Sequence, residues 1–116
     1  MKNQAYHTAE ERIEAARRSK ATELDLSANW NAEDDSKLTE LPKSLSQLTH
    51  LQWLNLSEQK LETLPEWIGQ LTELKTLYVT ENRLRYLPES LGELTKLQHL
   101  NLSFNRLGSG LIKEIQ

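Results

Sequence analysis

The sequence contains no cysteine, and this absence excludes disulfide bonds, thiolate metal sites and thiol nucleophiles at once. It also has no apolar run longer than a few residues, so we expect neither a membrane-spanning segment nor a membrane partner. The first twenty residues are charged throughout and lack the apolar stretch and the cleavage site of a secretory signal. Without a signal or any thiol, the sequence favours a cytoplasmic location.

An excess of basic charge is missing as well. The 116 residues carry 14 Lys and Arg against 17 Asp and Glu, a formal net charge of −3. Five of the basic and three of the acidic side chains fall within residues 1–20, so the rest of the chain is the more acidic part. A surface that neutralises phosphates needs clustered Lys and Arg, and we therefore expect no nucleic-acid partner.

Sequence motifs for catalysis and for metal or cofactor binding are also absent. The four glycines form no phosphate-binding loop. His7, His50 and His99 lie far apart and show none of the spacings of a zinc site. Ser103 can be combined with His99 and a carboxylate on paper, but no nucleophile-elbow sequence surrounds it. We therefore predict no enzymatic activity, no metal and no cofactor.

The sequence does contain a repeat of 23 residues, which occurs three times without a gap, from Leu48, Leu71 and Leu94. Leucine or valine recurs at equivalent positions of the three copies: Leu51, Leu54, Leu56 and Leu61; Leu74, Leu77, Val79 and Leu84; Leu97, Leu100, Leu102 and Leu107. Pro42, Pro65 and Pro88 repeat with the same spacing. An incomplete earlier copy places Leu24, Leu26 and Asn29 on this frame, with about seven residues inserted around 31–37.

The resulting pattern, L-x-x-L-x-L-x-x-N-x-L-x-x-L-P-x-x-[IL], resembles the leucine-rich repeat, in a 23-residue Leu-Pro form similar to that of cytosolic bacterial proteins. The resemblance implies an α/β fold, a right-handed solenoid with short parallel strands on its concave face and a 3₁₀ or extended convex side. We expect an N-terminal capping helix within residues 1–20. Residues 21–116 are expected to form about three and a half coils, with an irregular C-terminal end.

The residues themselves support this fold. Within each L-x-L stretch, alternate side chains face opposite sides of a strand, so the leucines share a core. The amides of Asn29, Asn82 and Asn105 are expected to pair with backbone groups where the chain bends, and Gln59 to substitute for asparagine there.

Residues 8–19 favour a helix that begins with a Thr8–Glu11 capping box and buries Ala9, Ile13 and Ala16 against the first coil. Trp30 and Trp67 fall on the convex or loop side, where we expect them to cover the core.

The outward-facing positions of the strands and the residues that follow them define the concave face. They form four rows: Glu23, Trp53, Thr76, His99; Asp25, Asn55, Tyr78, Asn101; Ser27, Ser57, Thr80, Ser103; and Ala28, Glu58, Glu81, Phe104. Trp53 and Tyr78 should be neighbours on adjacent coils, and exposed aromatic residues are typical of interface hot spots. We predict partner binding by eight residues: Trp53, Tyr78, His99, Phe104, Glu58, Glu81, Asn55 and Asn101. The alternative is that the aromatic residues only stabilise the sheet.

Two charged features are expected to be solvated. Glu33, Asp34 and Asp35 in the inserted segment lack the alternating ligands and the glycine of a calcium-binding loop. Lys60, Arg83 and Arg106 repeat directly after the asparagine position and form a basic row along one flank.

These observations favour a protein–protein interaction module that binds its partner on the concave face. Similarity to the repeat family implies a place within a signalling or effector protein. The alternative is a structural, self-associating unit that stacks through its uncapped C-terminal end at 111–115, with a homodimer as one form.

Overall fold

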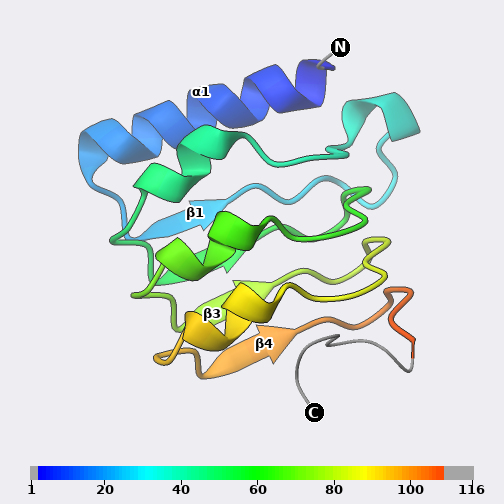
Figure 1. The fold of residues 1–116 in the computed structure, drawn as a ribbon. Helices are drawn as coiled ribbons and strands as arrows, with labels where there is room; N and C mark the ends of the chain where they lie inside the picture. The colour runs from blue at the N-terminus through cyan, green and yellow to red at the C-terminus, as the bar shows by residue number, and fades with distance from the viewer. Residues whose placement is uncertain (1–2, 109–116) are drawn as a thin grey trace.

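The computed structural model describes residues 3–108, which form a short stack of coils with an N-terminal helix covering its first coil (Figure 1). The helix is α1 (Gln4–Ser19), and the strands are β1 (Glu23–Asp25), β2 (Trp53–Asn55), β3 (Thr76–Tyr78) and β4 (His99–Asn101). The 3₁₀ helices of these residues are η1 (Asp34–Ser36), η2 (Lys43–Gln47), η3 (Glu66–Gln70) and η4 (Glu89–Glu93). The four strands form one parallel sheet in chain order, which confirms the predicted repeat fold. No helix within residues 3–108 is both long and apolar enough to cross a membrane.

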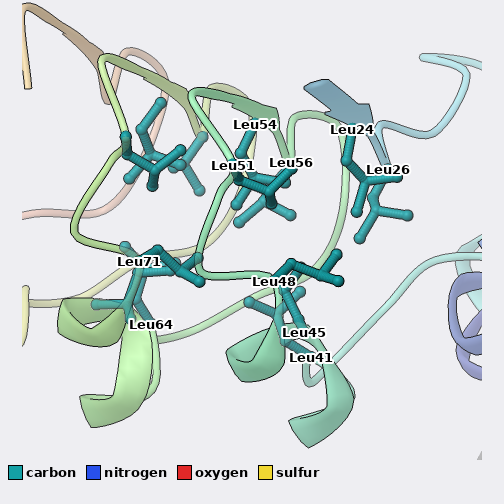
Figure 2. Packing of buried hydrophobic residues seen from close by; sticks show 14 of the residues in the cluster. Leu24, Leu26, Leu41, Leu45, Leu48, Leu51, Leu54, Leu56, Leu64 and Leu71 are labelled. Carbon is teal, nitrogen blue, oxygen red and sulfur yellow. The ribbon is translucent and has the colours of Figure 1, made fainter. Parts of the chain in front are cut away.

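The core lies between the strands and the 3₁₀ helices. In the register of the sheet, Leu24, Leu54, Leu77 and Leu100 are direct neighbours, each in the middle of its strand. Leu54 and Leu77 are 0% exposed. Figure 2 shows leucines of the strand side, such as Leu56, and leucines of the helix side, such as Leu45, pointing toward one another. The 23-residue period therefore stacks identical side chains into continuous apolar columns.

The Leu-Pro pair sets the start of each return segment. Pro42, Pro65 and Pro88 directly precede η2, η3 and η4 in extended conformations that suit the fixed dihedral of proline. The carbonyl oxygen of Pro65 accepts from Ile68 N at 3.0 Å, which closes the first turn of η3. Each proline thereby fixes where the chain turns back without losing a required N–H.

Helix α1 begins at Gln4, four residues earlier than the capping-box prediction, which is wrong. Asn3 is the N-cap: its Oδ1 accepts from Tyr6 N at 3.0 Å, and its Nδ2 donates to Lys37 O at 2.9 Å. Thr8 therefore lies inside the helix, because a capping residue was already available upstream. The predicted apolar face is confirmed, since Ala9, Ile13 and Ala16 are buried and the helix contacts β1, η1 and η2.

The asparagine positions join successive coils through paired hydrogen bonds. Asn82 accepts from Leu61 N and donates to Leu56 O of the previous coil, both at 3.0 Å. Gln59 makes the equivalent pair, accepting from Leu38 N at 2.7 Å and donating to Leu26 O at 2.6 Å. The predicted substitution of glutamine for asparagine is therefore confirmed.

The first asparagine of the column behaves differently from the others. Asn105 repeats the pairing with Leu84 N and Val79 O, at 2.9 and 2.8 Å. Asn29 is exposed, and its side chain makes no hydrogen bond to another described residue, so the prediction for it is wrong. The reason is that the preceding element is α1 and not a coil with free backbone groups.

The inserted segment is solvent-exposed and also contacts the basic row. Asp34 Oδ2 in η1 lies 3.8 Å from Lys60 Nζ and 3.6 Å from Arg83 Nη2. Lys60 and Arg83 keep only 21% and 36% of their side-chain surface exposed. Ion pairs at this exposure stabilise by less than about 1 kcal/mol, so their main effect is to orient the loop. The predicted solvation of Glu33, Asp34 and Asp35 is confirmed, since all three are exposed, whereas Lys60 and Arg83 of the basic row are only partly solvated.

Gly69 and Gly92 occupy equivalent positions of η3 and η4, but their surroundings predict that alanine destabilises the protein only at Gly69. A Cβ at Gly69 would lie 2.7 Å from the carbonyl oxygen of Ser90 in the next coil, whereas a Cβ at Gly92 would meet nothing within 4 Å. We expect Gly69→Ala to lower the free energy of unfolding by about 1–3 kcal/mol. Gly92→Ala should change it by less than about 0.5 kcal/mol. Urea unfolding followed by circular dichroism measures both, and equal effects would contradict the coil contact as the cause.

Candidate functional site

The concave face carries negative charge without positive charge. Its four acidic residues are Glu23, Asp25, Glu58 and Glu81, and none of its sixteen positions holds Lys or Arg. Lys75 stands just before β3 and is the basic residue next to this face in sequence. Among the described residues, none of the four carboxylates forms an ion pair, whereas Glu14, Asp34 and Glu73 elsewhere do. The acidic charge of this face is therefore left without compensation by the chain's own cations.

Two acidic side chains on other faces are tightly paired. On the outward side of α1, hydrogen bonds from Arg17 and then Arg18 lower the pKa of Glu14 from 4.5 to about 2. On the edge that precedes the strands, the hydrogen bond from Lys96 Nζ to Glu73 at 2.9 Å lowers the pKa of that carboxyl. These pairs show that the repeat can neutralise a carboxylate with its own cations, which the concave face does not do within residues 3–108.

Trp53 and Tyr78 form the centre of the face. Their ring centroids are 5.9 Å apart and their planes meet at 89°, an edge-to-face arrangement. In the register, Trp53 pairs with Thr76 and Asn55 pairs with Tyr78, so the two aromatic residues are diagonal neighbours. Both side chains are half-buried. The predicted proximity of these two residues is confirmed.

The polar residues of the second row serve the backbone. The side-chain oxygens of Asp25, Asn55 and Asn101 each accept from the backbone N–H two residues later, at 2.9, 3.0 and 3.0 Å. This bond holds the chain where it leaves the strand. Asn55 and Asn101 thus use part of their hydrogen-bonding capacity within the fold, which the sequence pattern alone did not indicate.

Tyr78 is the exception in this row, because its phenol cannot supply the same bond. The N–H of Thr80 is satisfied instead by Ser57 Oγ of the previous coil at 3.1 Å, and Thr80 Oγ1 also donates to Ser57 Oγ at 2.9 Å. Ser57 is buried at 8% exposure. The turn after β3 therefore does not depend on the side chain of Tyr78. The hydrogen bonds of this turn do not require a tyrosine at position 78.

The fourth row has an unusual backbone conformation. Glu58, Glu81 and Phe104 have φ values of 65°, 56° and 61°, in the left-handed region. For residues other than glycine this region costs roughly 1–2 kcal/mol. Phe104 is also 75% exposed. Three side chains held in one strained conformation form a row at the end of the strands, separate from the aromatic pair.

His99 lies in β4, the last strand that the structure describes. It pairs with Thr76 in the register, which puts it diagonal to Tyr78 on the side opposite Trp53. His99 is exposed, as is the whole of β4. The structure therefore brings Trp53 and Tyr78 into contact, places His99 beside Tyr78, and leaves Phe104 farther along the last described coil.

Trp30 is an exposed aromatic residue that the sequence reasoning misplaced. We expected it to cover the core, but it is 78% exposed, whereas Trp67 is partly buried and packs against the core as predicted. Trp30 follows Asn29 as Lys60 follows Gln59 and Arg83 follows Asn82. Charged side chains at this position in the later coils indicate that it lies at the protein surface and not in the core.

Comparison with known proteins agrees with this architecture. A family model described as a leucine-rich repeat region matches residues 24–116. Among solved structures, a leucine-rich-repeat protein of Leptospira interrogans is similar, with 34% sequence identity and a TM-score of 0.62. The similarity covers 76% of this chain and 27% of that one, so this chain spans about a quarter of the length of its structural relative. A search of curated proteins finds no match.

Proposed function

This chain belongs to the leucine-rich-repeat family, and on that basis we propose that it is a protein-binding module whose concave face holds the partner. Proteins of this family generally act in protein–protein interaction and as scaffolds without enzymatic activity. The single observation that carries the proposal is the perpendicular Trp53–Tyr78 pair, half-exposed at the centre of an acidic sheet. By its resemblance to cytosolic bacterial repeat proteins, the module would act within a cytoplasmic signalling or effector protein.

The rigid setting of the aromatic pair supports this proposal. Leu54 and Leu77 lie next to Trp53 and Tyr78 in the same strands, and both leucines are 0% exposed. A ring anchored on a packed strand loses little conformational freedom when a partner binds, so more of the contact energy contributes to affinity. Trp and Tyr are enriched among the residues that dominate interface energies.

Sheet stabilisation alone does not account for these two residues. The positions equivalent to Trp53 hold Glu23, Thr76 and His99, and those equivalent to Tyr78 hold Asp25, Asn55 and Asn101. At these positions the other coils have no large aromatic side chain, and yet they form equivalent strands with the same pairing. A cross-strand aromatic pair adds roughly 0.2–1 kcal/mol to a sheet, which the other coils do without.

The test uses residues that the chain already accepts at these positions. In the variant Trp53→Thr/Tyr78→Asn, each aromatic residue is replaced by one found at the equivalent place of another coil, and Trp30→Ser removes an exposed tryptophan elsewhere. Partners are captured from lysate with the native chain and both variants, then purified and measured by calorimetry. Two hot-spot residues predict a loss of affinity of about 30-fold or more for the double variant. Trp30→Ser should bind like the native chain.

Equal binding by the folded double variant, or no partner for any of the three chains, would refute recognition through this face. Circular dichroism of each bait establishes that the comparison is between folded proteins.

Exposure at the end of the sheet favours self-association as a second candidate function. Leu100 is 40% exposed, although its equivalents Leu54 and Leu77 are 0% exposed, and β4 pairs with one neighbour within the described residues. The segment 111–115, which we expected to mediate stacking, lies outside the described residues. Sedimentation of the native chain separates the candidates, because only self-association requires an oligomer.

A further inference from the structure

The Trp53–Tyr78 pair forms a corner with two ring faces. The two ring planes meet at 89° and their centroids are 5.9 Å apart. A face of Trp53 and a face of Tyr78 therefore lie at a right angle to each other and border the same space. Thr76 and Asn55, the register partners of Trp53 and Tyr78, carry shorter side chains. A planar group approaching the sheet can therefore contact both rings at once.

Carboxylates stand next to this corner. Glu23 is the direct partner of Trp53 in the register, and Asp25 is the direct partner of Asn55. Neighbouring strands are about 4.8 Å apart, so both carboxyl groups lie within reach of a side chain seated on Trp53. Asp25 uses one oxygen to accept from Ser27 N, and neither residue forms an ion pair within residues 3–108. The corner thus combines electron-rich ring faces with unpaired negative charge.

This combination fits one kind of ligand. A guanidinium group is planar, permanently charged and weakly hydrated, so it stacks on aromatic rings while donating hydrogen bonds to carboxylates. An ammonium group shares the charge but not the plane, and an acidic side chain would be repelled by Glu23 and Asp25. An uncharged apolar anchor would leave both carboxylates next to a desolvated contact.

Resting on the proposed function, we propose that the partner presents a basic, arginine-containing segment, with one arginine side chain seated in the Trp53–Tyr78 corner beside Glu23 and Asp25. Glu58 and Glu81, at the ends of β2 and β3, extend the acidic surface along which the flanking basic residues would lie. The specificity of the module then comes from the corner, and its rate of association from the charge of the whole face.

Nuclear magnetic resonance of the native chain tests this with defined peptides. A peptide amide of four arginines is titrated at low salt, beside peptides of four lysines and four glutamates. We expect the arginine peptide to shift the indole N–H signal of Trp53 and the ring signals of Tyr78, and to leave Trp30 and Trp67 unchanged. Affinity for the lysine peptide should be about threefold to tenfold lower, and the glutamate peptide should not bind.

Two variants separate the contribution of the aromatic rings to binding from that of the carboxylates. Asp25→Asn keeps the acceptor for Ser27 N, as Asn55 and Asn101 do for their own turns, so Glu23→Gln/Asp25→Asn removes charge without changing the backbone bonds. We expect this variant to bind the arginine peptide about tenfold more weakly. Trp53→Thr/Tyr78→Asn has lost both ring signals, so its binding is followed through the backbone amide signals of the sheet, and it should be at least about tenfold weaker than that of the native chain. Non-specific attraction of a polycation would instead leave the aromatic substitution without effect.

The inference is overturned if the arginine peptide leaves Trp53 and Tyr78 unshifted, or if the charge variant binds it as well as the native chain does. If that happens while a captured protein still requires Trp53 and Tyr78, the proposed function stands and only the arginine anchor is wrong. A captured protein that binds Trp53→Thr/Tyr78→Asn as well as the native chain overturns both proposals.

Discussion

Replacing Leu77 by alanine is expected to lower the free energy of unfolding by about 3–5 kcal/mol. Leu77 is 0% exposed in β3, and its register partners Leu54 and Leu100 lie on either side of it. Truncation removes apolar contacts on both sides and leaves a cavity that the packed columns cannot close. Since small domains have total stabilities of only about 5–15 kcal/mol, the change should shift the urea midpoint by a large fraction of its native value.

The matched control is Leu100→Ala in β4. This leucine holds the same position of the repeat but is 40% exposed, so we expect a loss of only about 1–2 kcal/mol. Both variants are measured by urea unfolding with circular dichroism and tryptophan fluorescence as independent probes. A loss at Leu100 as large as that at Leu77 would mean that Leu100 is covered in solution. That result would favour self-association through the end of the sheet.

Replacing Asn82 by alanine should cost about 2–5 kcal/mol without any loss of apolar packing. Asn82 is 6% exposed and satisfies Leu61 N and Leu56 O, two groups in the interior between coils. Each buried backbone group left without a partner costs about 1–3 kcal/mol. The equivalent change Asn29→Ala should cost less than about 0.5 kcal/mol, because Asn29 is exposed and joins no preceding coil.

Thermal and urea unfolding of the two asparagine variants measure this difference. Similar stabilities for Asn82→Ala and the native chain would show that the amide contributes little, and that the columns of leucine alone hold the coils together.

The columns of leucine, the parallel sheet and the contact between Trp53 and Tyr78 were all predictable from the sequence. A gapless 23-residue repeat leaves one register, and in that register Trp53 and Tyr78 are diagonal neighbours on adjacent strands. The apolar face of α1 was predictable for a similar reason, since Ala9, Ile13 and Ala16 follow the helical period. In each case a local pattern repeats often enough to determine where a side chain points.

Features outside the repeat were decided by tertiary structure. The cap at Asn3, the position of Trp30 and the docking of Asp34 on Lys60 and Arg83 involve segments that have no equivalent in the other coils. Nothing in the period constrains them, so the sequence predicts that the 31–37 insertion is solvated but not which side chains it contacts.

The same distinction applies within the candidate site. The sequence by itself determined which residues face outward, because alternation along a strand is a property of the backbone. Only the tertiary structure decided that Ser57 replaces the missing acceptor for Thr80, and that Glu23 and Asp25 remain without a cationic partner among the described residues. Hydrogen bonds and ion pairs between coils depend on the distances between particular atoms, and a pattern of residue types does not contain those distances.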